Sequence, residues 1–119
     1  MSDVDGEILK GHLDMIVLGA LANEPLHGYA IIQQIKLRSG GVFDLPEGTI
    51  YPALHRLERR EYLTSQWTTG ETGRKRRTYR ITRPGKRALT EHRAVWQRFT
   101  QAVAGIFGEA SHAASRSRG

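Results

Sequence analysis

The fold of this chain is decided by one stretch, Gly48-Thr49-Ile50-Tyr51-Pro52-Ala53-Leu54-His55-Arg56-Leu57-Glu58. We predict a helix over residues 49–60, with the proline in its first turn, where it is tolerated. One side of this helix is apolar and carries Ile50, Ala53, Leu54 and Leu57. The opposite side is polar and basic and carries Pro52, His55, Arg56 and Arg59, flanked by Thr49, Tyr51 and Arg60. Such a helix can pack against a core and still present positive charge to a partner.

Two further helices are expected before this stretch. Residues 8–23 repeat apolar side chains at helical spacing, and the proline at position 25 ends the pattern. Residues 28–38 form a second amphipathic segment. Its buried side is expected to carry Tyr29, Ile32 and Ile35. The three helices together predict a small helical core.

A basic β-hairpin is expected after the third helix. Residues 63–69 and 77–82 are rich in aromatic and β-branched side chains, which favour strands. In the second strand, Tyr79 and Ile81 fall on the same side of the alternation. The turn between the strands, residues 70–76, contains two glycines and ends in a run of bases.

A long helix is predicted over residues 84–108, with Thr82 as its N-cap. Its apolar positions are spaced alternately by three and four residues, as in the seam of a coiled coil. These positions are Leu89, His92, Trp96, Phe99, Val103 and Ile106. A seam this short is not stable alone, so it requires a partner surface. A second copy of the chain, together with the first helix, would supply one.

The charge of the chain is unevenly distributed along its 119 residues. Residues 1–48 carry seven acids and three bases, a net charge of −4, whereas residues 49–87 carry eleven bases and three acids, a net charge of +8. A polyanion would bind the central stretch, and nucleic acid is the first candidate. The alternative is a solvated basic face without a partner.

The composition indicates a single domain in the cytoplasm. The chain has no cysteine, which excludes disulfides and thiolate chemistry and fits a reducing compartment. Its longest apolar run, residues 15–22, is too short to cross a bilayer, so no membrane partner is expected. The acidic N-terminus lacks the basic start of a signal peptide.

The sequence gives no support to an enzyme. The five histidines show no metal-ligand spacing, and no glycine-rich phosphate loop precedes a helix. We therefore expect neither a metal nor a cofactor. Two non-enzymatic alternatives stay open: an RNA-binding module, which would need aromatic side chains on a sheet face, and a protein adaptor, which would have no use for the basic hairpin.

Three segments of the chain resemble the PadR family of bacterial transcriptional regulators. They are residues 27–31, residues 79–85 and, most specifically, the Gly-Thr-x-Tyr-Pro-x-Leu-x-x-Leu pattern that begins at Gly48. The resemblance covers residues 13–107 and implies a winged helix-turn-helix with a two-stranded β-wing, a mainly α fold. It also implies a C-terminal dimerisation helix, in the manner of the short subfamily that has one helix after the wing. The family usually has glycine after the third helix, where this chain has Tyr62.

The resemblance implies an arrangement in four parts. Residues 1–7 would be a flexible N-terminus, residues 8–83 the DNA-binding domain, residues 84–108 the dimerisation helix and residues 109–119 a flexible tail. It further implies a sequence-specific repressor that binds a pseudo-palindromic operator as a homodimer. A small hydrophobic or phenolic ligand would release it from the DNA.

The resemblance assigns contacts with double-stranded DNA to the start of the third helix, at Thr49, Tyr51, Pro52 and His55. From their charge and position we add Arg56 and Arg59 of the same helix, and Arg74, Lys75, Arg76 and Arg77 of the wing. Tyr29 at the start of the second helix is a further candidate, with burial as its alternative. Hydroxyl and basic side chains would position the protein on phosphates, while side chains at base edges would read the sequence. Alternatives stay open: Tyr51 could pack in the core, and Arg56 or Arg59 could pair with Glu58 or Glu61.

A pocket for the effector would lie at the dimer interface beside the last helix. The resemblance places Trp96 and Phe99 there, and Asp14 and Met15 of the first helix could line it. Two copies of the tryptophan could stack on a flat ligand. The alternative is that Trp96 only fills the dimer core.

Overall fold

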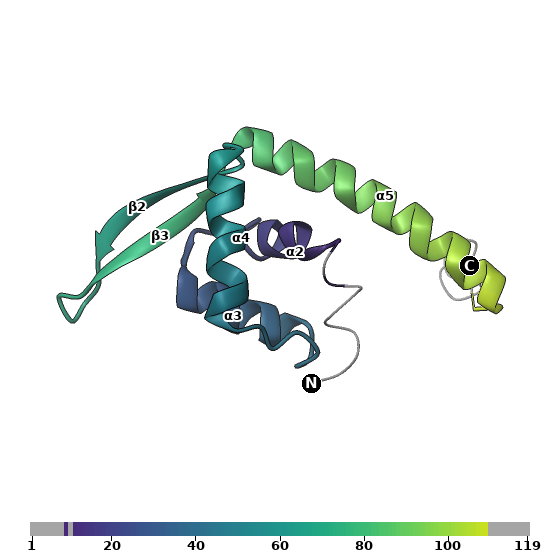
Figure 1. Cartoon of the computed structure of the whole chain (residues 1–119), viewed down its shortest axis with the longest axis horizontal. Coiled ribbons are helices and arrows are strands. Elements are labelled where there is room, and N and C mark those ends of the chain that lie inside the picture. The colour runs from purple at the N-terminus through teal and green to yellow at the C-terminus, as the bar shows by residue number, and fades with distance from the viewer. Residues whose placement is uncertain (1–8, 10, 110–119) are drawn as a thin grey trace. The chain divides into compact units, whose positions relative to one another are not determined.

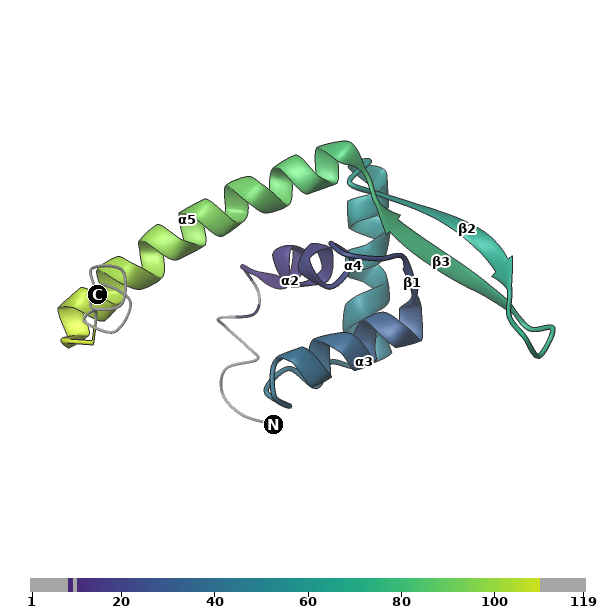
Figure 2. The same cartoon turned by 180° about the vertical axis from the view of Figure 1, so that it is seen from behind.

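The structure is a computed structural model that describes residue 9 and residues 11–109. The chain divides into two units between Leu89 and Thr90. Figures 1 and 2 show the elements of the first unit, in which the β2–β3 hairpin extends away from three short helices. These elements are α2 (Leu13–Ala20), β1 (Leu26–His27), α3 (Gly28–Arg38), α4 (Glu47–Arg59), β2 (Leu63–Thr69), β3 (Lys75–Ile81) and the start of α5 (Arg83–Phe107). The predicted mainly α, winged-helix fold is confirmed.

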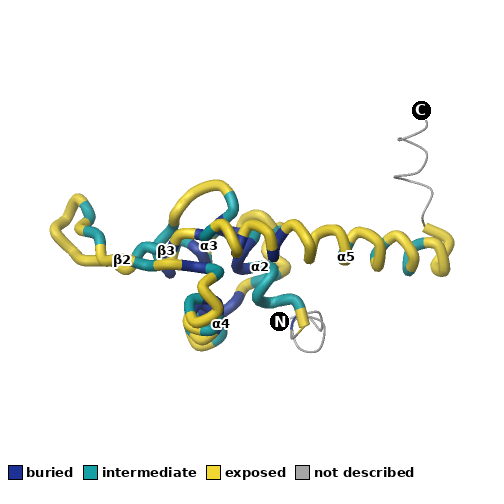
Figure 3. The backbone as a smooth tube through the Cα atoms, turned by 90° about the horizontal axis from the view of Figure 1, so that it is seen from above, coloured by how far each residue is buried: buried dark blue, intermediate teal, exposed yellow. Residues whose placement is uncertain are grey.

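The core of the first unit lies where the helices meet the base of the hairpin. Figure 3 shows the buried positions gathered there, whereas most of α5 is exposed. The largest fully buried side chains are Tyr79, Leu18, Leu21, Ile31, Ile50, Leu54, Leu57, Leu63 and Val17. Burial of each aliphatic side chain contributes about 1.5–3 kcal/mol, which holds α4 against its neighbours.

The sheet has three antiparallel strands in the order β1-β3-β2, one more than the sequence predicts. Strand β1 is only two residues long, and its partners are on β3: Leu26 faces Tyr79 and His27 faces Thr78. A two-residue strand shows no alternation that a sequence could reveal. It exists because β3 offers unpaired backbone groups along its second edge.

The helix α2 is shorter than the predicted range of residues 8–23. It begins after its N-cap His12, because Gly11 and His12 form a turn. At its other end it is capped by Leu21. Glycine weakens a helix interior, which accounts for the break at residue 11. Residues 8 and 10 of the predicted range lie outside the described residues.

The helix α3 has the predicted bounds. Of the three residues predicted on its buried side, Ile35 is buried and Ile32 is half-buried against the core, whereas Tyr29 was predicted wrongly, since its side chain is 56% exposed. Gly28 and Ile31 complete the buried side. Gly28 is buried because the side chain of Tyr51 packs directly on it.

The helix α4 starts two residues before the predicted start at Thr49. Pro46 is its N-cap, and the Pro46 carbonyl accepts hydrogen bonds from the amides of Thr49 and Ile50 at 3.0 and 3.1 Å. Pro52 consequently lies inside the helix rather than in its first turn, so that prediction was wrong. Without an amide hydrogen, Pro52 leaves the carbonyl of Gly48 without its helical donor.

The end of α4 adopts a Schellman motif. The amide of Tyr62 donates to the carbonyl of Leu57 at 3.0 Å, and the amide of Glu61 donates to the carbonyl of Glu58 at 2.9 Å. Glu61 has φ 65°, so the left-handed residue is Glu61 and not Tyr62. The left-handed residue after the third helix thus lies one position before Tyr62, which stands where the family usually has glycine.

The hairpin extends further toward its tip than the sequence predicts. Strand β2 has the predicted bounds, whereas β3 begins at Lys75 rather than Arg77, because Lys75 pairs with Thr69. The turn therefore shortens to residues 70–74, and Gly73 supplies the positive φ of 83° that it requires. Tyr79 and Ile81 lie on the same side of the strand, as predicted, and both are buried.

The helix α5 begins on the predicted N-cap. The side-chain oxygen of Thr82 accepts a hydrogen bond from the amide of Gly85 at 3.0 Å and donates one to the carbonyl of Glu61 at 2.7 Å. This hydroxyl joins the end of α4 to the start of α5. The helix then runs for 25 residues, from Arg83 to Phe107.

Candidate nucleic-acid interface

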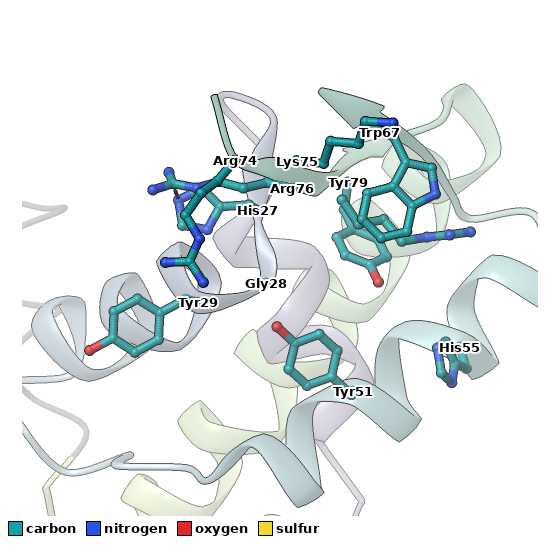
Figure 4. Close-up of a pocket in the computed structure, with 11 residues that line it drawn as sticks. His27, Gly28, Tyr29, Tyr51, His55, Trp67, Arg74, Lys75, Arg76 and Tyr79 are labelled. Carbon is teal, nitrogen blue, oxygen red and sulfur yellow. Dashed lines mark hydrogen bonds between the residues drawn. The ribbon is translucent and has the colours of Figure 1, made fainter. Parts of the chain in front are cut away.

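An open groove of about 530 Å³ lies between the start of α3, the outer side of α4 and the β2–β3 hairpin. Figure 4 shows the side chains that converge on it. They are His27, Gly28, Tyr29, Tyr51, His55, Trp67, Arg74, Lys75, Arg76, Arg77 and Tyr79. The groove thus brings together seven of the residues predicted to contact DNA, although they come from three separate parts of the sequence.

The outer side of α4 forms one wall of the groove. Pro52, His55 and Arg59 are exposed, whereas Thr49 and Tyr51 are half-buried. The ring of Tyr51 rests on Gly28 of α3, which fixes its direction while its hydroxyl faces the groove (Figure 4). Tyr51 therefore both packs against the protein and presents a hydroxyl, which combines the two roles considered for it.

Arg56 points toward α2 rather than toward the two glutamates considered as its partners. Its Nη2 atom lies 2.8 Å from Oδ1 of Asp14, and Arg60 lies 3.9 Å from the other oxygen of the same carboxylate. The side chains of Arg56 and Asp14 remain 42% and 30% exposed. The pair joins α2 to α4, and it places Asp14, a candidate for the ligand pocket, beside the third helix.

The hairpin forms the other wall and is tied to α4 by Arg77. The Arg77 Nε atom donates to the Ser65 hydroxyl at 2.9 Å, and its Nη2 atom lies 3.6 Å from the Glu58 carboxylate. The Ser65 hydroxyl in turn donates to Glu58. The Arg77 guanidinium also lies 5.6 Å from the centre of the Trp67 ring, within cation–π range. These contacts hold the base of the hairpin in place.

The exposed bases of the hairpin lie at its tip. Arg74, Lys75 and Arg76 are all exposed, and Arg76 reaches back to His27 at the start of α3. At the back of the groove, burial raises the pKa of the Tyr79 hydroxyl above its ordinary value. The groove is a neutral aromatic floor below a positively charged rim.

Comparison with known proteins identifies the family. Residues 17–91 match the transcriptional regulator PadR-like family. The chain belongs to the PadR-like family. Transcriptional regulators of this kind act by binding DNA, which agrees with the charge and position of the groove.

Relatives of this PadR-like chain match it over most of their length. The transcriptional regulator Rv3488 of Mycobacterium tuberculosis is 34% identical over 83% of this chain and 89% of its own. An uncharacterized protein of Lysinibacillus sphaericus is 37% identical over 78% of this chain and 85% of its own. The crystal structure of a PadR family regulator from Eggerthella lenta has a TM-score of 0.71 and 35% identity, and it covers 85% of this chain and 86% of its own.

Four residues that line the groove in this PadR-like chain were not predicted to contact DNA: His27, Gly28, Trp67 and Tyr79. Trp67 is 62% exposed on β2, and His27 closes the end of the groove above α3. Trp67 could have been found from the sequence by pairing the residues of the two strands outward from the turn. That pairing places Trp67 directly opposite Arg77, which was a predicted DNA contact. No local signal marks His27, because its partner Arg76 is far away in the sequence.

The α5 residues predicted to form the dimer seam of this PadR-like chain fall into two groups. Leu89 is buried in the core of the first unit. In the second unit, Phe99 and Ile106 are 58% and 82% exposed, and the rings of Trp96 and Phe99 stack with their centres 5.9 Å apart. His92 is exposed and Val103 half-buried. Met15, the other residue suggested for a ligand pocket, is half-buried against the core.

The described part of the chain holds no helix that is long and apolar enough to cross a membrane. Within the same residues, no three histidine or acidic side chains gather in a way that could hold a metal ion.

Proposed function

We propose that this chain is a repressor that binds a pseudo-palindromic operator as a homodimer in the cytoplasm. One observation carries the proposal: the exposed side of α4 and the basic tip of the hairpin border the same groove. A helix fits the major groove of B-DNA, and a basic hairpin can reach the adjacent backbone. The DNA-binding domain would comprise residues 8–83, and residues 84–108 would serve dimerisation.

In this proposal the side chains divide between two tasks. Pro52, His55 and Arg59 are exposed on α4 and would meet base edges. The hairpin bases Arg74 and Lys75 would neutralise phosphates, which adds affinity without sequence selectivity. In the free protein Arg56 and Arg77 are engaged by Asp14 and Glu58, so they would position α4 and the hairpin first and contact phosphate second.

Dimerisation would use the exposed apolar side chains of α5, among them Phe99 and Ile106. Two copies related by a twofold axis would place their α4 helices in successive major grooves, about 34 Å apart. A flat hydrophobic or phenolic effector stacked on Trp96 and Phe99 would release the DNA by changing that spacing. It can do so only if it binds the two dimer arrangements with unequal affinity.

The proposal is tested by a salt-titrated binding assay on the DNA upstream of the protein's own gene, with unrelated DNA as competitor. We expect a dissociation constant on the order of 10⁻⁸ M or lower, retained in the presence of competitor. Weak binding that is equal for both DNAs would contradict the operator and leave only a basic surface, as in the adaptor or RNA-binding alternatives.

The role of the hairpin is tested by the double variant Arg74→Ala/Lys75→Ala. It should weaken binding to all sequences similarly and flatten the dependence of affinity on salt. The matched control is Lys86→Ala/Arg87→Ala, which removes two exposed bases outside the groove. Equal salt slopes for the two variants would remove the hairpin from the complex.

A further inference from the structure

His27 lies where β1 passes into α3, and both of its ring nitrogens face hydrogen-bond donors. Its Nδ1 atom accepts from the amide of Ala30 at 3.3 Å and thereby caps α3. Its Nε2 atom lies 3.0 Å from Nη1 of Arg76, at the tip end of the hairpin. An arginine side chain has only donors, so both neighbours of this imidazole offer hydrogens and neither can accept one.

A neutral imidazole has one accepting nitrogen and one N–H, so it can satisfy only one of these donors. If Nδ1 caps the helix, the hydrogen lies on Nε2 and points toward the Arg76 guanidinium. Burial, and then the nearby Arg76 charge, lower the pKa of His27 below 6.5, so the ring is neutral at pH 7.5. In the tautomer in which Nδ1 caps α3, the Nε2–H of His27 and the Arg76 guanidinium are therefore two donors directed at one place.

We propose that His27 and Arg76 bind one backbone phosphate of DNA between them. The inference rests on the DNA-binding function proposed above and adds a contact on α3. A phosphate oxygen would accept from both Nε2–H of His27 and the guanidinium of Arg76, while Nδ1 keeps the cap on Ala30. No tautomer change and no proton uptake are needed.

The surroundings select an anion over other ligands. Figure 4 shows the Arg74 side chain on the same side of the groove as His27 and Arg76. Among the described residues that line this groove, none is acidic. Arg76 is exposed and His27 half-buried, so a phosphate on the surface of a DNA duplex can reach both. A row of fixed donors with a planar guanidinium suits phosphate in particular.

The decisive variant is His27→Asn. Asparagine is a good N-cap, so its side-chain oxygen can still accept from Ala30, but its shorter side chain does not carry an N–H to the position of the His27 Nε2 atom. At pH 7.5 we expect His27→Asn to bind the operator about tenfold more weakly, since a hydrogen bond to a charged group is lost. Arg76→Ala should cost at least as much. The double variant should bind more tightly than two independent losses allow, because both residues serve one phosphate.

The phosphate itself is located by replacing single phosphates of the operator with neutral methylphosphonates. At one position per half-site the replacement should weaken the wild-type protein more than His27→Asn, which keeps Arg76, and should leave the His27→Asn/Arg76→Ala double variant unchanged. Identical profiles and equal affinities for the wild-type protein and His27→Asn would overturn the inference and leave the proposed function intact. If the wild-type protein showed no specific DNA binding, both the proposed function and this inference would be wrong.

A measurement on the wild-type protein avoids dependence on the variant's folding. The ¹⁵N resonances of the His27 ring should show the hydrogen on Nε2 in the free protein. They should move when operator DNA is added, with the hydrogen still on Nε2. A hydrogen on Nδ1 in the complex would contradict the arrangement, because Nε2 would then be the acceptor.

Discussion

The hydroxyl end of the Tyr51 side chain on α4 packs directly against Gly28 on α3. A β-carbon added to residue 28 would stand 2.6 Å from Cζ of Tyr51, closer than two such atoms can approach. Glycine is therefore required at residue 28 because any side chain would collide with Tyr51. Its backbone conformation does not require glycine, because φ is not positive there. This contact sets the direction of a groove side chain that stands on the third helix.

Gly28→Ala should displace Tyr51 and weaken DNA binding. Because the clash involves the far end of a side chain that can move, we expect a loss of about 1 kcal/mol in the free energy of unfolding, at the low end for overpacking. Urea denaturation measures the stability and fluorescence anisotropy the DNA affinity. Gly19→Ala is the matched control, since a β-carbon there meets nothing within 4 Å. Equal DNA affinities for the two variants would contradict a role for the Tyr51 position.

Glu61→Gly should stabilise the protein. Glu61 has φ 65°, a conformation that costs a residue with a β-carbon about 1 kcal/mol, whereas glycine adopts it freely. Glycine also enlarges the entropy of the unfolded chain, so we expect a net gain of about 0.5 kcal/mol by urea denaturation. Glu61→Ala should bring no gain, because alanine keeps the strain. If alanine stabilised as much as glycine, the glutamate side chain and not the backbone would be the cause.

Acidification should destabilise the fold through His27. Its pKa in the folded protein is lowered from 6.5 by burial and by Arg76, so the folded state binds this proton less tightly than the unfolded state. The stabilising contribution is then complete above the unfolded pKa and is lost as the pH falls below it. Urea denaturation of the wild-type protein and of His27→Asn at pH 7.5 and 5.5 measures the effect. The wild-type protein should lose more stability than the variant, and parallel losses would exclude His27 as the cause.

Trp67 should become protected when DNA binds. Its ring is 62% exposed and lines the groove beside Arg77. The chain has two tryptophans, so Trp96→Phe leaves Trp67 as the only indole. Iodide should quench its fluorescence in the free protein and quench it less in the operator complex. Unchanged quenching would place the DNA away from the β2 side of the groove.

Two glutamates on the apolar side of α5 should separate the proposed dimer. Phe99 is exposed and Val103 half-buried in the second unit, and charges at these positions would be costly to bury in an interface. Phe99→Glu/Val103→Glu should sediment as a monomer. The matched control is Gln97→Glu/Gln101→Glu, which adds the same charge on the opposite side of the helix, at exposed positions. A dimeric Phe99→Glu/Val103→Glu variant would place the interface elsewhere.

Several features of this protein follow from neighbouring residues and can be predicted from the sequence. The bounds of α3 and β2, the Thr82 cap and the buried pair of Tyr79 and Ile81 are of this kind. Each depends on interactions within a few positions, such as a cap reaching three residues ahead or the alternation of a strand. The basic tip of the hairpin and the polar side of α4 are visible for the same reason.

Other features required the tertiary structure, because their partners are distant in the sequence. The pairing of β1 with β3, the bond of Arg56 to Asp14 and the contact of Arg76 with His27 join separate segments. The burial of Gly28 has the same origin, since it depends on a side chain contributed by α4. Local periodicity can say that a helix has a buried side. Only the packing of one element on another decides which residues occupy it, and which side chains meet in the groove.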